Sequence, residues 1–188
     1  QMPQVMRWYR DFITTAPEEL NGFFAVLKVP PAPSFPAALH GRTVCGVVWC
    51  HCGAAADAEA LFDSVRTFGA PPLLHAVQQL PYPAWQSAFD DFYTPGLQWY
   101  WRADFFTELS DASIAEHESC AAALPTLHST MHLYPLGGAA GRVGRNDTAF
   151  SFLDHLGDIK VALTFAELDA RARAIAVRLR QHLRAGDR

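Results

Sequence analysis

Proline and glycine repeatedly interrupt the apolar segments of this chain, and the interruptions limit how long any element can be. Residues 23–29 form an apolar run between Asn21-Gly22 and Pro30-Pro31, and residues 43–52 form a second run after a proline-rich loop. Apolar runs of this length between turn residues are typical of β-strands, and two in succession predict a hairpin. The sequence therefore predicts strands in adjacent pairs rather than in strict alternation with helices.

Helices are predicted between these strands wherever apolar residues recur every three or four positions. Ser110 is predicted as an N-cap, because its hydroxyl can accept a hydrogen bond from the first helical turn. The predicted helices are 5–14, 54–68, 83–92 and 111–124, and the further strands are 73–80, 97–106, 129–136 and 139–143. This order predicts an α+β fold, with an antiparallel β-sheet covered by helices on one face. The other face is aromatic, so we expect a partner or ligand there.

Residues 149–188 differ in character and are predicted to form a C-terminal strand–helix appendage. Residues 159–164 are a short predicted strand, and Thr164 with Glu167 forms a capping box at the start of a helix. Arginines fall mostly on the other faces of this helix. Its apolar residues recur at helical spacing: Leu168, Ala172, Ile175, Leu179 and Leu183. We interpret this as a core stripe beside a solvated face. Binding to a membrane surface is the minor alternative, because the stripe is rich in alanine.

Charge and hydropathy exclude two classes of partner. The 188 residues carry a formal net charge of −4, whereas a nucleic-acid groove needs clustered lysine and arginine to displace counterions. No apolar run approaches the roughly 18 residues that a membrane-spanning helix requires. We therefore predict no nucleic-acid partner and no membrane span.

The four cysteines favour a structural role over a metal site. None follows C-x-x-C spacing, and in a strand Cys50 and Cys52 share one face while His51 points to the other. That arrangement suits a half-buried strand better than a tetrahedral zinc site, which needs further ligands at suitable spacing. Free thiols are typical of a cytoplasmic protein, so we predict that location and no metal.

Residues 131–144 hold the most promising chemistry. His132 and Tyr134 point to one side of their predicted strand, where two titratable groups can form a proton-transfer site. Taken alone, the pattern is more typical of the edge of a core. The glycine-rich residues 137–144 match neither phosphate-loop pattern, and a bend or bulge in a strand is the favoured interpretation. Trp99 and Trp101 could wall a flat ligand, although core packing is the usual role of such a run.

An ordered set of segments resembles the substrate domain of FAD-linked oxidases of the berberine-bridge type, especially its bacterial members. The segments span roughly residues 1–150: Pro17–Leu20, Pro81–Gln86, Trp99–Arg102 with Phe105, Glu108–Asp111, Tyr134–Ala139 with Arg142-Val143, and Asp147–Phe150. The resemblance implies an antiparallel sheet whose open face lies over the flavin ring of FAD. It also implies oxidation of an alcohol or an amine, with hydride passed to the flavin and oxygen as the usual acceptor.

Site residues follow from this resemblance position by position. The family's Pro-x-Gly-Gly stretch matches Pro135 to Gly138, so Gly137 and Gly138 are predicted to contact the cofactor. A glutamate base often precedes that proline in plant members, and Tyr134 stands there in this chain. Tyr134 and His132 are therefore the predicted catalytic residues. The predicted substrate-binding residues are Trp99, Trp101 and Arg102.

The resemblance also implies that this chain is one part of a larger oxidase. It has no match to the family's flavin-binding domain, so we expect that it neither retains FAD nor turns over substrate alone. The missing flavin-binding domain and a small-molecule substrate are its predicted partners.

The tail has a resemblance of its own. Residues 149–154 and 163–176 are similar to the start of fatty-acyl-AMP ligases and other adenylation domains, without their ATP loop. We therefore predict two regions, 1–148 from an oxidase-like substrate domain and 149–188 from an AMP-binding ligase fragment, joined as a fusion. Two alternatives to the oxidase function stay open: a piece of a ligase fusion, and a non-catalytic interaction domain.

Overall fold

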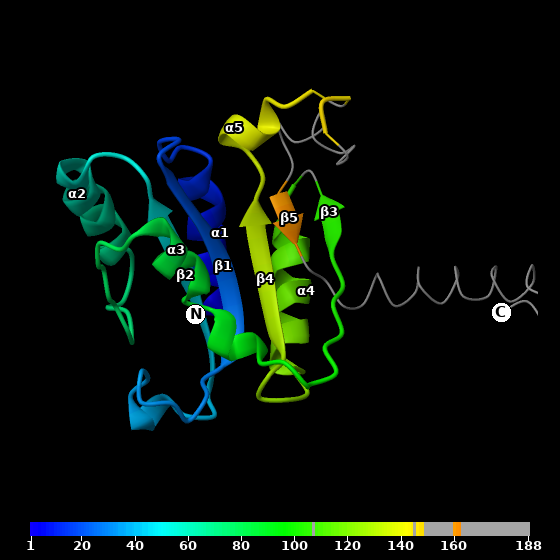
Figure 1. The fold of residues 1–188 in the computed structure, drawn as a ribbon. Coiled ribbons are helices and arrows are strands. Elements are labelled where there is room, and N and C mark those ends of the chain that lie inside the picture. Colours follow the sequence, from blue (N-terminus) through cyan, green and yellow to red (C-terminus); the bar gives the residue numbers. More distant parts are fainter. Residues whose placement is uncertain (107, 145, 149–159, 163–188) are drawn as a thin grey trace, which may run out of the picture. The chain divides into compact units, whose positions relative to one another are not determined.

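A computed structural model describes residues 1–106, 108–144, 146–148 and 160–162, and its architecture is α+β (Figure 1). The first half of the chain contains α1 (Met2–Ile13), β1 (Leu20–Lys28), β2 (Thr43–His51) and α2 (Ala55–Arg66), with the short 3₁₀ helix η1 (Ala37–Leu39) between the two strands. After these come α3 (Tyr82–Ser87), the 3₁₀ helix η2 (Asp90–Tyr93), β3 (Asp104–Phe106), α4 (Asp111–Ala122), β4 (Thr130–Pro135), α5 (Gly138–Gly141) and β5 (Lys160–Ala162).

The strands form one five-stranded sheet in the order β2-β1-β4-β5-β3. The pairings β1–β4, β4–β5 and β3–β5 are antiparallel, as the sequence predicts. The predicted hairpin closes at Val29, which exchanges backbone hydrogen bonds with Gly41 and Arg42. Strand β4, which carries the predicted catalytic residues, therefore lies in the middle of the sheet, between β1 and β5.

Helices α1 and α4 lie on the same side of the sheet, behind β1 and β4 in Figure 1. Their apolar side chains and those of the two strands form one buried cluster: Met6, Tyr9, Phe24, Val26, Leu109, Ile114, Ala121, Leu124, Met131 and Leu133. Burial of this apolar surface is the main force that holds the helices against the sheet. The prediction that helices cover one face of an antiparallel sheet is confirmed.

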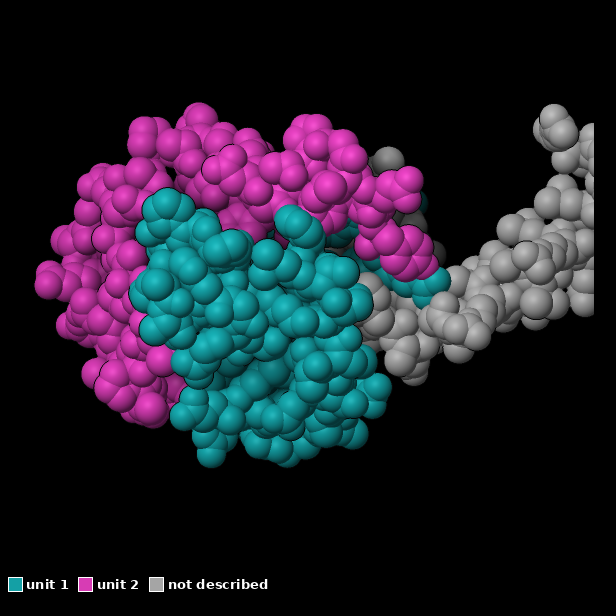
Figure 2. Space-filling view, turned by 90° about the horizontal axis from the view of Figure 1, so that it is seen from below, with its two compact units in different colours: residues 1–50, 101–188 teal, residues 51–100 magenta. Residues whose placement is uncertain are grey.

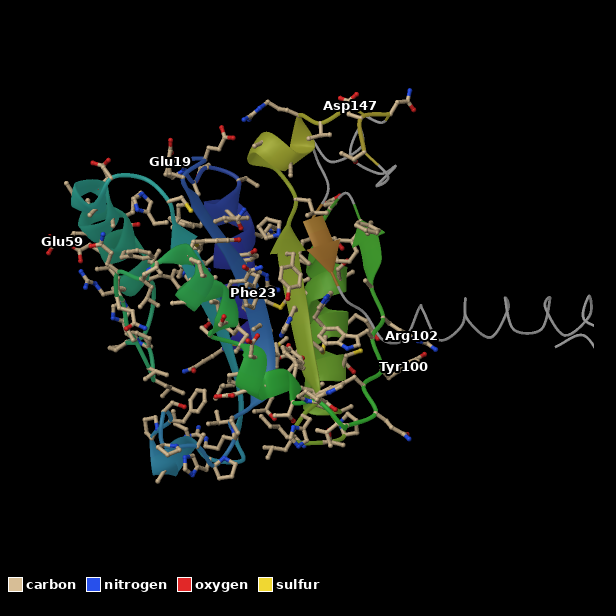
Figure 3. The ribbon with its side chains drawn as sticks, viewed as in Figure 1. Glu19, Phe23, Glu59, Tyr100, Arg102 and Asp147 are labelled. Atoms are coloured by element: carbon tan, nitrogen blue, oxygen red, sulfur yellow. The ribbon has the colours of Figure 1, made fainter. Side chains whose placement is uncertain are left out.

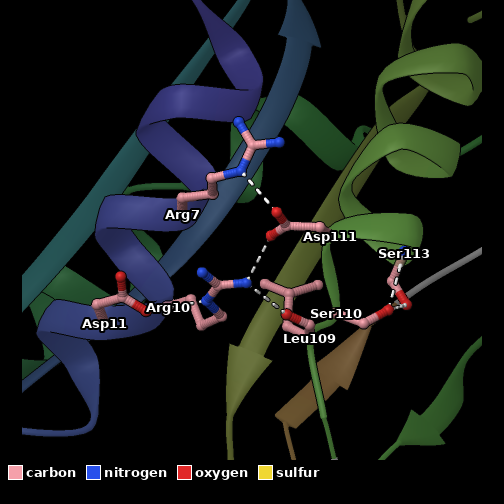
Figure 4. Close-up of polar contacts among 7 residues, drawn as sticks. All are labelled: Arg7, Arg10, Asp11, Leu109, Ser110, Asp111 and Ser113. Atoms are coloured by element: carbon pink, nitrogen blue, oxygen red, sulfur yellow. Dashed lines mark hydrogen bonds and ion pairs between the residues drawn. The ribbon is translucent and has the colours of Figure 1, made fainter.

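Polar contacts also join the two helices at one end (Figure 4). Asp111, in the first turn of α4, forms ion pairs with two arginines of α1. Its Oδ1 lies 2.9 Å from Arg10 Nη1, and its Oδ2 lies 3.3 Å from Arg7 Nε. Arg10 also donates to the Leu109 carbonyl oxygen. The predicted N-cap of α4 is confirmed, because the Ser110 hydroxyl accepts a hydrogen bond from the Ser113 backbone N–H at 3.1 Å. These contacts fix where α4 begins.

Gly22 in β1 is required by close packing. A Cβ at this position would lie 2.3 Å from the ring of Trp49 on β2, so no larger side chain fits without displacing that ring. The Gly22 carbonyl oxygen accepts a hydrogen bond from the Tyr9 hydroxyl at 2.7 Å. Burial raises the pKa of Tyr9, so this phenol stays protonated and acts as a donor. The Trp49 ring also meets Phe12 of α1 edge-on, with ring centroids 5.5 Å apart.

The chain divides into two compact units, coloured separately in Figure 2. Unit 1 comprises Gln1–Cys50 and Trp101–Arg188 and contains the buried cluster described above. Unit 2 comprises His51–Tyr100, and among its hydrophobic residues only Phe62 is buried. Seven large apolar side chains of unit 2 are instead exposed: Leu73, Leu74, Val77, Leu80, Tyr82, Leu97 and Tyr100.

Three predictions of local structure are wrong. Residues 73–80 form no strand, because an extended segment needs a neighbouring strand to pair with its backbone and none of the described residues supplies one. The predicted strand 97–106 is confined to β3, its last three residues. Residues 139–143 do not resume a strand, because positive φ at Gly138, +58°, turns the backbone into the short helix α5.

The predicted appendage is only partly described. Its strand is present as β5, but β5 lies within the sheet, between β4 and β3, rather than apart from it. The predicted helix after residue 164 and most of the ligase-like region lie outside the described residues. The boundary predicted between 148 and 149 therefore stays a prediction.

Candidate functional site

The candidate site lies at the end of β4, where side chains alternate between the two faces of the sheet. Met131 and Leu133 point into the buried cluster beneath α1 and α4. His132 and Tyr134 consequently point to the opposite face, as the two-residue period of a strand requires. The register pairs His132 with Ala25 of β1 and Tyr134 with Val161 of β5.

The structure brings the two predicted catalytic side chains into direct contact. His132 Nδ1 and the Tyr134 hydroxyl oxygen are 2.7 Å apart, which is the distance of a short hydrogen bond. His132 is 8% exposed and Tyr134 is 37% exposed, so the pair joins a buried residue to a partly exposed one. The prediction that both residues share one face is therefore confirmed by their contact, whereas their catalytic role stays a prediction.

Phe23 of β1, labelled in Figure 3, completes an aromatic cluster with this pair. Its ring centroid lies 5.0 Å from that of Tyr134, at an interplanar angle of 31°, and 5.3 Å from that of His132. The sequence prediction missed Phe23. The pairing of β1 with β4 could have revealed it, because Phe23 lies two positions before Ala25, the partner of His132, and so on the same face.

Burial sets the charge of this cluster. Desolvation lowers the pKa of His132 from its ordinary 6.5 to about 4, because a charged imidazolium is costly to bury. His132 is therefore neutral near pH 7, with one ring nitrogen protonated and the other available as an acceptor. The Tyr134 hydroxyl can both accept and donate, so it can pair with whichever tautomer of His132 is present.

The two predicted cofactor-binding glycines differ in what the fold requires of them. Gly138 has φ +58°, and a Cβ there would lie 3.3 Å from Glu18 Cγ, so both the backbone and its neighbour favour glycine. Gly137 has ordinary extended backbone, φ −150° and ψ −159°, and a Cβ there would meet nothing within 4 Å. The fold therefore explains Gly138 and leaves open space above Gly137.

Glu18 is a second residue whose place in the site the sequence did not reveal. Its carboxylate accepts a hydrogen bond from Arg142 Nη2 at 2.6 Å. The hydrogen bond from Arg142 is the main cause that lowers the pKa of Glu18. The loop before β1 is thereby tied to the turn that follows Tyr134.

The three predicted substrate-binding residues fall in different units of the chain. Trp99 belongs to unit 2, where its indole N–H donates to the Thr94 carbonyl oxygen at 3.1 Å and its ring meets Tyr93 edge-on. Trp101 and Arg102 belong to unit 1 and precede β3, and Trp101 is 59% exposed. Figure 3 labels Arg102 on this segment. Their role as a substrate wall stays a prediction.

Metal and membrane sites are not evident in the described part of the chain. No three histidine, cysteine or acidic side chains gather there in a way that could hold a metal ion. All four cysteines are free thiols. No helix among the described residues combines the length and the apolar character needed to cross a membrane.

Comparison with known proteins adds no further identification. No protein-family model matches this chain, and a search of the curated proteins finds no matching relative.

Proposed function

We propose that this chain is part of an FAD-dependent oxidase, in which the sheet face of Tyr134 and His132 covers the substrate side of the flavin ring. The observation that carries the proposal is the hydrogen-bonded Tyr134–His132 pair beside Phe23, at the end of a strand that leads to an open glycine. The resemblance of residues 1–150 to the berberine-bridge oxidases supports it further.

The residues fit a flat aromatic group. The rings of Tyr134 and Phe23 contact each other, with centroids 5.0 Å apart, and together form an aromatic surface. Planar ligands pack well on such surfaces. The space above Gly137 allows a ligand to approach the backbone, because no atom of the described residues would lie within 4 Å of a Cβ there. Bound flavin would supply the hydride acceptor for an alcohol or amine substrate.

The contribution of the chain itself is to hold and move a proton. An alcohol or amine that loses hydride from carbon must also lose a proton from oxygen or nitrogen. The Tyr134 hydroxyl can accept that proton from the substrate and pass its own phenolic proton to Nδ1 of neutral His132. The low pKa of His132, about 4, makes the imidazolium unfavourable at rest, so this pair is a weak base until a ligand changes its surroundings.

The chain is proposed to contact only the ring of the flavin. Residues 137–144 match no phosphate loop, and tight flavin binding would fall to a separate flavin-binding domain, the proposed partner together with the small-molecule substrate. We further propose a cytoplasmic protein, because its four cysteines are free.

The test is a titration of the full chain with riboflavin, FMN and FAD, in which quenching of flavin fluorescence reports binding. If only the ring is recognised, the three should bind alike, with dissociation constants of about 1 mM or weaker. Gly137→Val should weaken binding several-fold, because its side chain fills the space that the ring needs. Gly46→Val is the matched control, since a Cβ there also meets nothing within 4 Å. No quenching, or equal weakening by both variants, would refute the proposal.

A further inference from the structure

We propose that Glu18 is a positioning residue, which through its ion pair with Arg142 and its packing over Gly138 holds the Gly137–Gly138 turn against the end of β4. The inference rests on the proposed function, because the purpose of the turn is to place its open glycine beside the flavin ring. Glu18 touches neither ligand nor reacting atoms, so its effect on binding is indirect.

The geometry of the turn carries this inference. Only two residues separate the end of β4 at Pro135 from the start of α5 at Gly138. Glu18 contacts this turn in two ways: its carboxylate accepts from Arg142 Nη2 at 2.6 Å, and its Cγ lies over Gly138. A single side chain from a loop 120 residues earlier thus spans both ends of α5.

A surface ion pair alone would be a weak argument. Glu18 and Arg142 are 50% and 65% exposed, and exposed pairs of this kind contribute little to overall stability. Here the same side chain also packs on the turn, because its Cγ lies 3.3 Å from where a Cβ of Gly138 would stand. The contact is therefore expected to act on the local order of residues 137–141 rather than on global folding.

The chain offers a matched control in the adjacent residue. Glu19 carries the same charge one position later and is exposed, and Figure 3 labels it beside the start of β1. Glu19→Gln therefore changes the net charge of the chain as Glu18→Gln does. A difference between the two variants reports the contacts of Glu18 alone.

The experiment combines hydrogen exchange with riboflavin titration of the full chain. Glu18→Gln should speed amide exchange in residues 137–141 roughly threefold or more. It should also weaken riboflavin binding by a similar factor. The midpoint of thermal unfolding should be the same for Glu18→Gln as for Glu19→Gln. Arg142→Gln should reproduce both effects. The double variant should add nothing, as expected for one shared contact.

The outcomes separate this inference from the proposed function. Exchange in residues 137–141 that matches Glu19→Gln would overturn the inference, and so would faster exchange with unchanged riboflavin affinity. If the unmodified chain binds no riboflavin, the proposed function fails. The exchange data then decide by themselves whether Glu18 holds the turn.

Discussion

The two faces of the sheet in unit 1 have the same backbone and opposite chemistry. On the face beneath α1 and α4, β1 and β4 contribute Phe24, Val26, Met131 and Leu133, all apolar and at most 4% exposed. On the other face the same strands contribute Phe23, Ala25, His132 and Tyr134, where a neutral imidazole and a phenol share a hydrogen bond. Strand alternation thus directs the core side chains to one face and this polar pair to the other.

The sharpest way to break this comparison is to truncate two adjacent phenylalanines. Phe24→Ala should lower the free energy of unfolding by about 3–5 kcal/mol, because Phe24 is 1% exposed and leaves a cavity. Phe23→Ala should cost roughly half as much or less, because Phe23 is only partly buried. Urea unfolding of both variants measures the difference. Equal losses would show that both faces stabilise the fold alike.

The buried histidine of the second face predicts the next largest effect, a dependence of stability on pH. The pKa of His132 is about 4 when folded and near 6.5 when unfolded. The unfolded chain therefore binds more protons between these values, and stability falls as pH drops through that window. The loss approaches roughly 3 kcal/mol below pH 4. Burial lowers the pKa of His117 as well, which adds in the same direction.

Unfolding by urea at several pH values between 7 and 4 tests this dependence. His132→Asn should flatten the curve, because asparagine does not titrate. The exposed His75 supplies the control, since His75→Asn should leave the curve as it is. A curve unchanged by His132→Asn would mean that this face does not hold a neutral histidine.

The sequence predicted the helix-backed face better than the other one. The α4 N-cap at Ser110 and the presence of strands β1 and β2 were predictable because local signals and buried periodicity agree there. Strand 73–80 was mispredicted because none of the described residues supplies a strand that pairs with its backbone, and its large apolar side chains stay exposed. Phe23 and Glu18 were missed because each gains its role from residues more than 100 positions away. Pairing between distant segments is not encoded in any local pattern.

The smallest expected effect sharpens the comparison most, because it removes one atom from the second face. Tyr134→Phe deletes the hydroxyl that lies 2.7 Å from His132 Nδ1 and keeps the ring beside Phe23. The free energy of unfolding should fall by about 1 kcal/mol or less, since the hydroxyl is partly exposed and water can replace it. Riboflavin affinity should be nearly unchanged, because ring stacking persists.

The ¹⁵N shifts of the His132 ring should move in Tyr134→Phe, because Nδ1 loses its partner. Tyr82→Phe, at a more exposed tyrosine of unit 2, should leave those shifts in place. If Tyr134→Phe also leaves them in place, the two residues do not form the proton-sharing pair on which the proposed chemistry depends.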